Sequence, residues 1–214
     1  MPDQAQILTA LSTEHFGLAG ARSQAASESA SRSALYLGSV SSTLVGLGLT
    51  AQVSRESQVF HVFALVALPT LFALGVFTFV RLVELGIEDF LLGRAINRIR
   101  HYYLEHAGDS TRYFMLSGHD DATGVMANMG MAPSRLQLYF TAAMAIAVVN
   151  AVVGGAAVAL AVGLAFGIPL GIAVAAGATA AVMTLLVALR YQNARREAGT
   201  SHPILFPSEP AVGS

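Results

Sequence analysis

Long apolar blocks dominate the pattern of hydrophobic and polar positions along this chain. They cover residues 34–53, 60–80, 138–167 and 168–189. Each is at least as long as the roughly 20 apolar residues that a helix needs to cross a bilayer. The pattern therefore predicts an all-α membrane protein with four transmembrane helices.

Two short connections order these helices in pairs. Residues 54–58 read SRESQ, and the residues around Pro169 read GIPLG. Connections this short place consecutive helices side by side and antiparallel. We therefore expect two transmembrane hairpins, at residues 34–80 and 138–190.

The second apolar block continues without a break into a charged stretch. Residues 81–106 read RLVELGIEDFLLGRAINRIRHYYLEH, and apolar side chains recur every four residues from Val83 to Tyr103. This period predicts a cytosolic amphipathic helix, continuous with the second span, whose apolar stripe needs a covering surface. Its arginines are candidates for docking a partner or anionic lipid headgroups, with simple packing as the alternative: Arg81, Arg94, Arg98 and Arg100.

Three other segments contain no predicted transmembrane helix. Residues 1–33 are a polar cytosolic arm, which we expect to form either a short helix on the membrane surface or a frayed end. Residues 107–137 are expected to be a long loop that completes the cytosolic part at 81–137. Residues 191–214 contain several prolines and no period, which predicts a flexible tail.

The central loop contains the only concentration of metal-binding residue types. His119, Asp120 and Asp121 are adjacent, and histidines and a glutamate occur at 101–106. Imidazole and carboxylate groups suit several divalent ions. The spacing matches no standard site, however, and a turn explains Asp and Gly equally well. We therefore predict no metal site, no cofactor and no catalytic residue.

Small residues recur every four positions in the first and third apolar blocks. Such stripes let helices approach closely in lipid, where packing drives association. We expect them to pack helices together, within the chain or between copies: Gly38, Ser42, Gly46, Thr50, Gly155, Ala159, Gly163 and Gly167.

Polar side chains inside the spans leave a second interpretation open. Ser41, Ser42, Thr43 and Asn150 could bond to neighbouring helices or face a conduit for ions. We favour interhelix packing, because buried hydroxyls and amides usually bond within a helix bundle. A transporter is disfavoured, since no ionisable residue lies at the middle of a span.

The arginines predict the orientation. The chain has no lysine or cysteine and a net charge of −1, so neither a disulfide nor a nucleic-acid partner is expected. Six of the twelve arginines lie between residues 81 and 135, five lie near the ends, and one lies in a short turn. This positive-inside bias places both termini and the central segment in the cytoplasm. No cleaved signal peptide is expected, and the inner membrane is the predicted location.

Three stretches resemble a bacterial family of integral membrane proteins that share an IED…INRIRHYY block. They read ESASRSALYLGSVSSTLVGLGL, TFVRLVELGIEDFLLGRAINRIRHYY and YFMLSGHDD, and the resemblance covers roughly residues 28–160. It implies a membrane location but no reaction, because the family has no established activity. In topology alone, the layout also resembles the membrane effectors of nucleotide-signalled defence systems, a likeness that does not give function.

These patterns together predict a non-enzymatic integral membrane protein. We expect it to form a homo-oligomer or to bind a membrane partner protein, with the cytosolic helix used for assembly or docking. The alternative is an ion channel or a pore-forming membrane effector.

Overall fold

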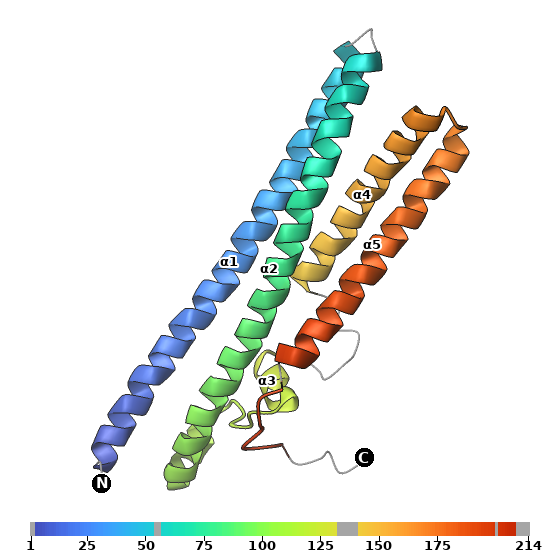
Figure 1. Ribbon diagram of the computed structural model, residues 1–214. Helices are drawn as coiled ribbons and strands as arrows, with labels where there is room; N and C mark the ends of the chain where they lie inside the picture. Colours follow the sequence, from blue (N-terminus) through green and yellow to red (C-terminus); the bar gives the residue numbers. More distant parts are fainter. Residues whose placement is uncertain (1–2, 54–56, 132–140, 200, 209–214) are drawn as a thin grey trace. The chain divides into compact units, whose positions relative to one another are not determined.

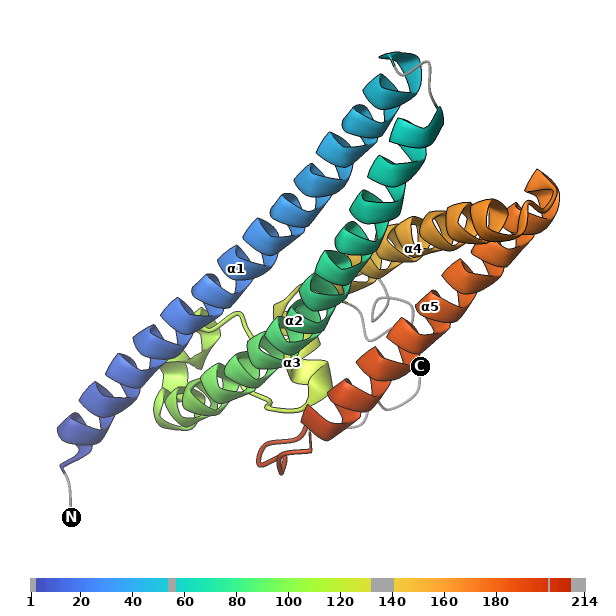
Figure 2. The same cartoon turned by 45° about the horizontal axis from the view of Figure 1, so that its top comes forward.

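A computed structural model describes residues 3–53, 57–131, 141–199 and 201–208 of the chain. Within these residues all regular structure is helical (Figures 1 and 2). The elements are α1 (Gln4–Val53), α2 (Ser57–His106), the 3-10 helix η1 (Gly108–Tyr113), α3 (Ala122–Asn128), α4 (Ala142–Phe166) and α5 (Leu170–Gly199). The all-α prediction is confirmed.

Four of these helices, α1, α2, α4 and α5, are long and apolar enough to cross a membrane. This agrees with the number of spans predicted from the apolar blocks. α1 and α2 have 50 residues each. At 1.5 Å per residue each is about 75 Å long, more than twice the roughly 30 Å of bilayer hydrocarbon. Each helix is therefore longer than a single crossing of the bilayer requires.

The chain forms two compact units, to which α1 and α2 both contribute. We call Met1–Glu28, Leu85–Tyr139 and Glu197–Ser214 the polar unit. Ser29–Glu84 and Phe140–Arg196 form the apolar unit.

The N-terminal arm differs from its prediction. α1 begins at Gln4, so residues 4–33 belong to the same helix as the first span and form neither a short surface helix nor a frayed end. Tertiary contacts explain the difference, because Ala25 is buried and Arg22 pairs with Asp89 of α2 at 2.7 Å. The predicted turn at 54–58 lies largely outside the described residues, since the structure leaves out 54–56.

A buried hydrogen bond joins helices of the apolar unit. The hydroxyl of Tyr36 on α1, a residue 1% exposed, donates to Oδ1 of Asn150 on α4 at 3.0 Å. Gly75 of α2 leaves room for this pair: a Cβ there would overlap the Asn150 amide and lie 2.8 Å from the Tyr36 hydroxyl. Asn150 is thus an interhelix contact in this unit.

Small residues bring α4 and α5 into backbone contact. A Cβ at Gly155 would lie 2.6 Å from the carbonyl oxygen of Gly177, and one at Gly177 would lie 2.8 Å from Cβ of Ala159. A Cβ at Gly163 would meet Ala173 at 3.5 Å. The last member of the stripe, Gly167, has φ 59° and ends α4, a left-handed position that favours glycine.

Candidate functional site

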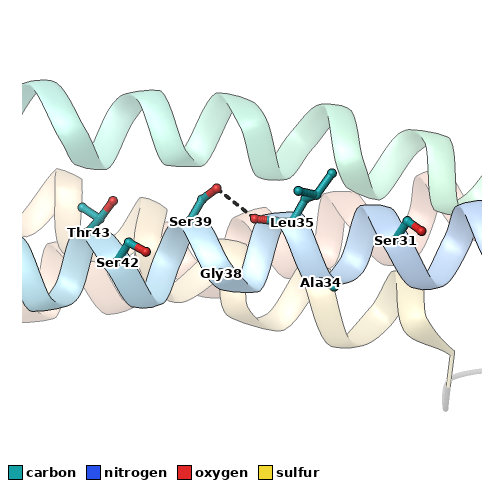
Figure 3. Close-up of a pocket in the computed structure, with 7 residues that line it drawn as sticks. All are labelled: Ser31, Ala34, Leu35, Gly38, Ser39, Ser42 and Thr43. Atoms are coloured by element: carbon teal, nitrogen blue, oxygen red, sulfur yellow. Dashed lines mark hydrogen bonds between the residues drawn. The ribbon is translucent and has the colours of Figure 1, made fainter.

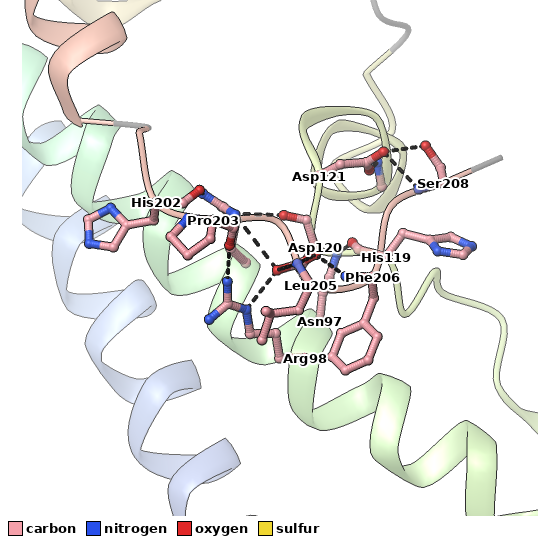
Figure 4. A network of polar contacts seen from close by, with 12 residues as sticks. Asn97, Arg98, His119, Asp120, Asp121, His202, Pro203, Leu205, Phe206 and Ser208 are labelled. Atoms are coloured by element: carbon pink, nitrogen blue, oxygen red, sulfur yellow. Dashed lines mark hydrogen bonds and ion pairs between the residues drawn. The ribbon is translucent and has the colours of Figure 1, made fainter. Parts of the chain in front are cut away.

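A network of arginine and aspartate side chains lies in the polar unit (Figure 4). Its members are Arg94 and Arg98 of α2 and Asp120 and Asp121, which precede α3. We call these four residues the arginine–aspartate network. They contact residues 202–208, which follow α5.

Arg94 is the buried cation of the network. Only 4% of it is exposed, and its Nε donates to the carbonyl oxygen of Asp120 at 2.7 Å. Its Nη1 and Nη2 donate to the carbonyl oxygens of His202 at 3.1 Å and Pro203 at 3.0 Å. As a residue predicted to dock a partner, Arg94 would be expected to lie exposed on α2. The structure buries it instead, because carbonyl groups from distant parts of the chain compensate for its loss of water.

Asp120 is the buried anion of the network and is 0% exposed. Its carboxylate accepts hydrogen bonds from Nε of Arg98 at 2.7 Å and from the backbone N–H of Phe206 at 2.8 Å and of Leu205 at 3.1 Å. Burial by itself would raise the pKa of Asp120. The hydrogen bonds from Phe206, Arg98 and Leu205, together with the charge of Arg98, outweigh burial and lower that pKa below its ordinary value.

Asp121 joins α3 to the same segment. One carboxylate oxygen accepts from the backbone N–H of Gly124 at 2.8 Å and so caps α3. The other accepts from the backbone N–H of Ser208 at 2.9 Å and from the Ser208 hydroxyl. Burial would raise the pKa of Asp121, but the bonds from Ser208 and Gly124, together with the charge of His119, lower it.

Residues 201–208 therefore differ from the flexible tail predicted for 191–214. α5 itself continues to Gly199. Beyond it, the backbone N–H groups of Leu205, Phe206 and Ser208 find carboxylate acceptors. The Phe206 ring also stacks on His101 of α2, with ring centroids 3.8 Å apart. Each of these contacts replaces a contact with water that the same group would make in an unattached tail.

The predicted loop at 107–137 also contains structure. η1 and α3 lie within it, and residues 132–137, including Arg135, are outside the described residues. Two amides attach this segment to α2: Asn97 Nδ2 donates to the His119 carbonyl at 2.7 Å, and Asn128 Nδ2 donates to Asn97 Oδ1 at 2.9 Å. Gly124 permits the close return of the chain, since a Cβ there would overlap the same His119 carbonyl.

The four arginines predicted to dock a partner have different surroundings. Arg81 belongs to the apolar unit and lies 3.8 Å from Glu84. Arg94 and Arg98 donate hydrogen bonds to other groups of the same chain, so docking through them stays a prediction. Arg100 uses Nη1 for Asn97 at 3.0 Å and for the Ser117 carbonyl at 3.3 Å.

The predicted polar residues of the spans are not gathered at one place. Ser41 and Ser42 are exposed on α1, and Thr43 is half-buried there. Asn150 is buried and bonds to Tyr36 rather than to one of these hydroxyls.

The contacts of the network attach one segment of the chain to another. Its carboxylates bind guanidinium and backbone N–H groups of the same chain. Across the described ranges, no three or more His, Asp or Glu side chains converge to hold a metal ion. The arrangement is suited to fixing residues 202–208 beside α2 and α3.

Acid is expected to release this segment. Because the pKa of Asp120 and of Asp121 is lowered in the folded chain, their stabilisation is complete above the ordinary aspartate pKa of about 4. It is lost as the pH falls through the lowered values and the carboxylates take up protons. Hydrogen exchange at Leu205 and Phe206 should therefore lose protection as the pH falls below the ordinary aspartate pKa of about 4, while exchange at Ile146 of α4 stays slow. Unchanged protection at pH 2 would contradict this assignment.

Comparisons with known proteins give no relative: no family model, no curated protein and no solved structure matches this chain. The resemblance noted from the sequence therefore stays a prediction.

Proposed function

We propose that this chain is a non-enzymatic membrane protein that assembles with copies of itself through the outer face of α1. In this proposal its polar unit lies in the cytoplasm and binds a partner. The observation that carries the proposal is a groove along α1 that the described residues of the apolar unit leave uncovered.

The groove has a volume of about 820 Å³ and is lined by one helix (Figure 3). A Cβ at Gly38 would meet no described atom within 4 Å, and Leu35 beside it is 72% exposed. The lining residues are small or carry hydroxyls, apart from Leu35: Ser31, Ala34, Leu35, Gly38, Ser39, Ser42 and Thr43. In lipid, small residues on an outward helix face favour close approach of a second helix.

Four of the other small-residue positions already face a neighbouring helix inside the chain: Gly46, Gly155, Ala159 and Gly163. A Cβ at Gly46 would touch the Phe63 ring of α2 at 3.4 Å, and Thr50 donates to the Gly46 carbonyl at 2.7 Å. Gly155 and Gly177 face each other between α4 and α5. These contacts support two transmembrane hairpins, α1 with α2 and α4 with α5. They leave Gly38 and Ser42 as the stripe available to a second copy.

The proposed orientation rests on the arginines. Positive-inside placement puts both termini and residues 81–137 in the cytoplasm of an inner-membrane protein. The lengths of α1 and α2 support this arrangement, since each can cross the hydrocarbon and continue into water.

Replacing Gly38 by leucine is expected to weaken self-association at least tenfold, about 1.4 kcal/mol. The new side chain would fill the groove, yet the fold should persist because the site is open. Light scattering after size exclusion in dodecyl maltoside, over a range of protein concentrations, measures the effect. Gly48→Leu is the matched control, an open glycine of α1 that does not line the groove. A monomeric wild type, or equal association of both variants, would refute the proposal.

A channel is the second candidate, and the hydroxyls of the groove favour it. Ser31, Ser42 and Thr43 would line a pore if several copies turned this face of α1 inward. The Ser39 hydroxyl is already directed at the Leu35 carbonyl at 2.8 Å. An ion current in planar bilayers that Gly38→Leu abolishes would favour the channel over a purely structural assembly.

A further inference from the structure

A second groove lies in the polar unit, between the first part of α1 and the later part of α2. Its volume is about 520 Å³, within the roughly 300–1,000 Å³ of small-molecule sites. Its lining combines two arginines and one aspartate with polar and apolar side chains: His15, Ala19, Arg22, Ser23, Ala26, Asp89, Ile96 and Arg100. The arginine–aspartate network does not contribute to it.

Among the described residues that line this groove, the carboxylates do not balance the arginines. Arg22 binds Asp89 with two hydrogen bonds, Nε to Oδ1 at 2.7 Å and Nη2 to Oδ2 at 3.2 Å. Arg100 has no such partner: its Nη1 donates to Asn97 and to the Ser117 carbonyl. In the part of the chain that the structure describes, Nε and Nη2 of Arg100 have no acceptor. The lining therefore carries one excess positive charge, two arginines against one aspartate.

The two guanidinium groups also act on each other. Burial, and after it the charge of Arg22, lower the pKa of Arg100 from its usual value. An arginine stays charged at neutral pH even so. Two neighbouring cations at a partly buried site repel each other, and an anion between them would remove that repulsion.

A polar atom of the same lining is also left unsatisfied. Nδ1 of His15 is buried and has no hydrogen-bond partner among the described residues. A buried polar atom without a partner costs about 1–3 kcal/mol. An occupant of the groove with a polar group near His15 would recover part of this cost.

We infer that this groove binds a phosphate-bearing anion, with Arg22 and Arg100 as its two cationic contacts. A phosphate offers three oxygens, enough to accept from both guanidinium groups at once, and arginine–phosphate pairs are strong, geometrically specific contacts. Ala19, Ala26 and Ile96 offer apolar surface for the rest of the molecule. The phosphate belongs either to a soluble ester or to a phospholipid headgroup. This site goes beyond the proposed assembly and does not depend on it.

Titration of the full-length chain in dodecyl maltoside, a detergent without phosphate, separates the two sources. One arm uses inorganic phosphate and the other uses dihexanoylphosphatidylglycerol below its micelle concentration, both followed by calorimetry at constant ionic strength. We expect saturable binding in at least one arm, and at least tenfold weaker binding by Arg100→Gln. Arg112→Gln is the matched control, because Arg112 lies in η1 over the Tyr113 ring and outside the groove. It should bind as the wild type does.

A second variant covers the case in which Arg100→Gln disturbs the fold through Asn97 and Ser117. Ala26 is exposed in the groove, so Ala26→Phe fills the space and removes no polar contact. It should also bind at least tenfold more weakly, with unchanged helicity. Binding of phosphate indicates a soluble ester, and binding of the lipid alone indicates a headgroup. No binding in either arm, equal binding by the wild type and Ala26→Phe, or equal heat from acetate would overturn the inference.

Discussion

Replacing Asp120 by alanine is expected to lower the free energy of unfolding of the polar unit by about 3–5 kcal/mol, the usual effect of breaking a buried ion pair. The variant removes the acceptor for Nε of Arg98 and for the backbone N–H groups of Leu205 and Phe206. It also leaves the buried Arg94 without the carboxylate that lies 3.7 Å from its Nη2. The effect is large because the lost partner was fully buried, so water cannot take its place.

Urea unfolding in detergent, followed by circular dichroism, measures this change. Hydrogen exchange at residues 202–208 locates it, and protection there should be lost first. Asp109→Ala is the matched control, because Asp109 is an exposed aspartate of the same unit, in η1. A loss below about 1 kcal/mol for Asp120→Ala, the range of an exposed ion pair, would contradict the role given to the network.

Replacing Gly75 by alanine is expected to destabilise the apolar unit by about 1–3 kcal/mol, although alanine is the better helix former. The added methyl group would occupy the place of the Asn150 amide and approach the Tyr36 hydroxyl. Either the Tyr36–Asn150 hydrogen bond breaks or α2 moves away from α4. Both changes act on side chains that are almost fully buried.

Gly48→Ala is the control for this second experiment. A Cβ at Gly48 would meet no described atom within 4 Å, so the same methyl group should be neutral or slightly stabilising. Thermal unfolding of both variants in one detergent gives the comparison. If Gly75→Ala proved as stable as Gly48→Ala, the close approach of α2 to Asn150 would be refuted.

The long helices could be predicted because each signal is local. About 20 consecutive apolar residues indicate a span whatever the helix packs against. The stripe from Gly155 to Gly163 likewise predicts a close helix contact without naming the partner, and in the structure Gly155 and Gly163 lie beside α5. Such patterns show how a helix can pack, and the partner comes only from the structure.

The network could not be predicted, because its residues are distant in the sequence. Arg94 reaches a carbonyl 26 residues later and another 108 residues later, and Asp120 binds an N–H group 85 residues away. No hydrophobic period relates residues that lie so far apart in the sequence. Two clues were present: Arg94 and Arg98 lie one helical turn apart, and Asp121 precedes α3 as a capping residue would. The first predicts a local concentration of positive charge and the second a helix cap, but neither indicates residues 202–208.

The attachment of residues 202–208 has a consequence for biosynthesis. The ribosome makes Arg94 and Asp120 long before it makes the His202 carbonyl and the Phe206 N–H that bind them. During that interval Arg94 and Asp120 lack several of the partners that they have in the finished fold. The polar unit can therefore reach its final state only after α4 and α5 have been synthesised. Chaperones or proteases that act on the nascent chain would meet this unit while it is still open.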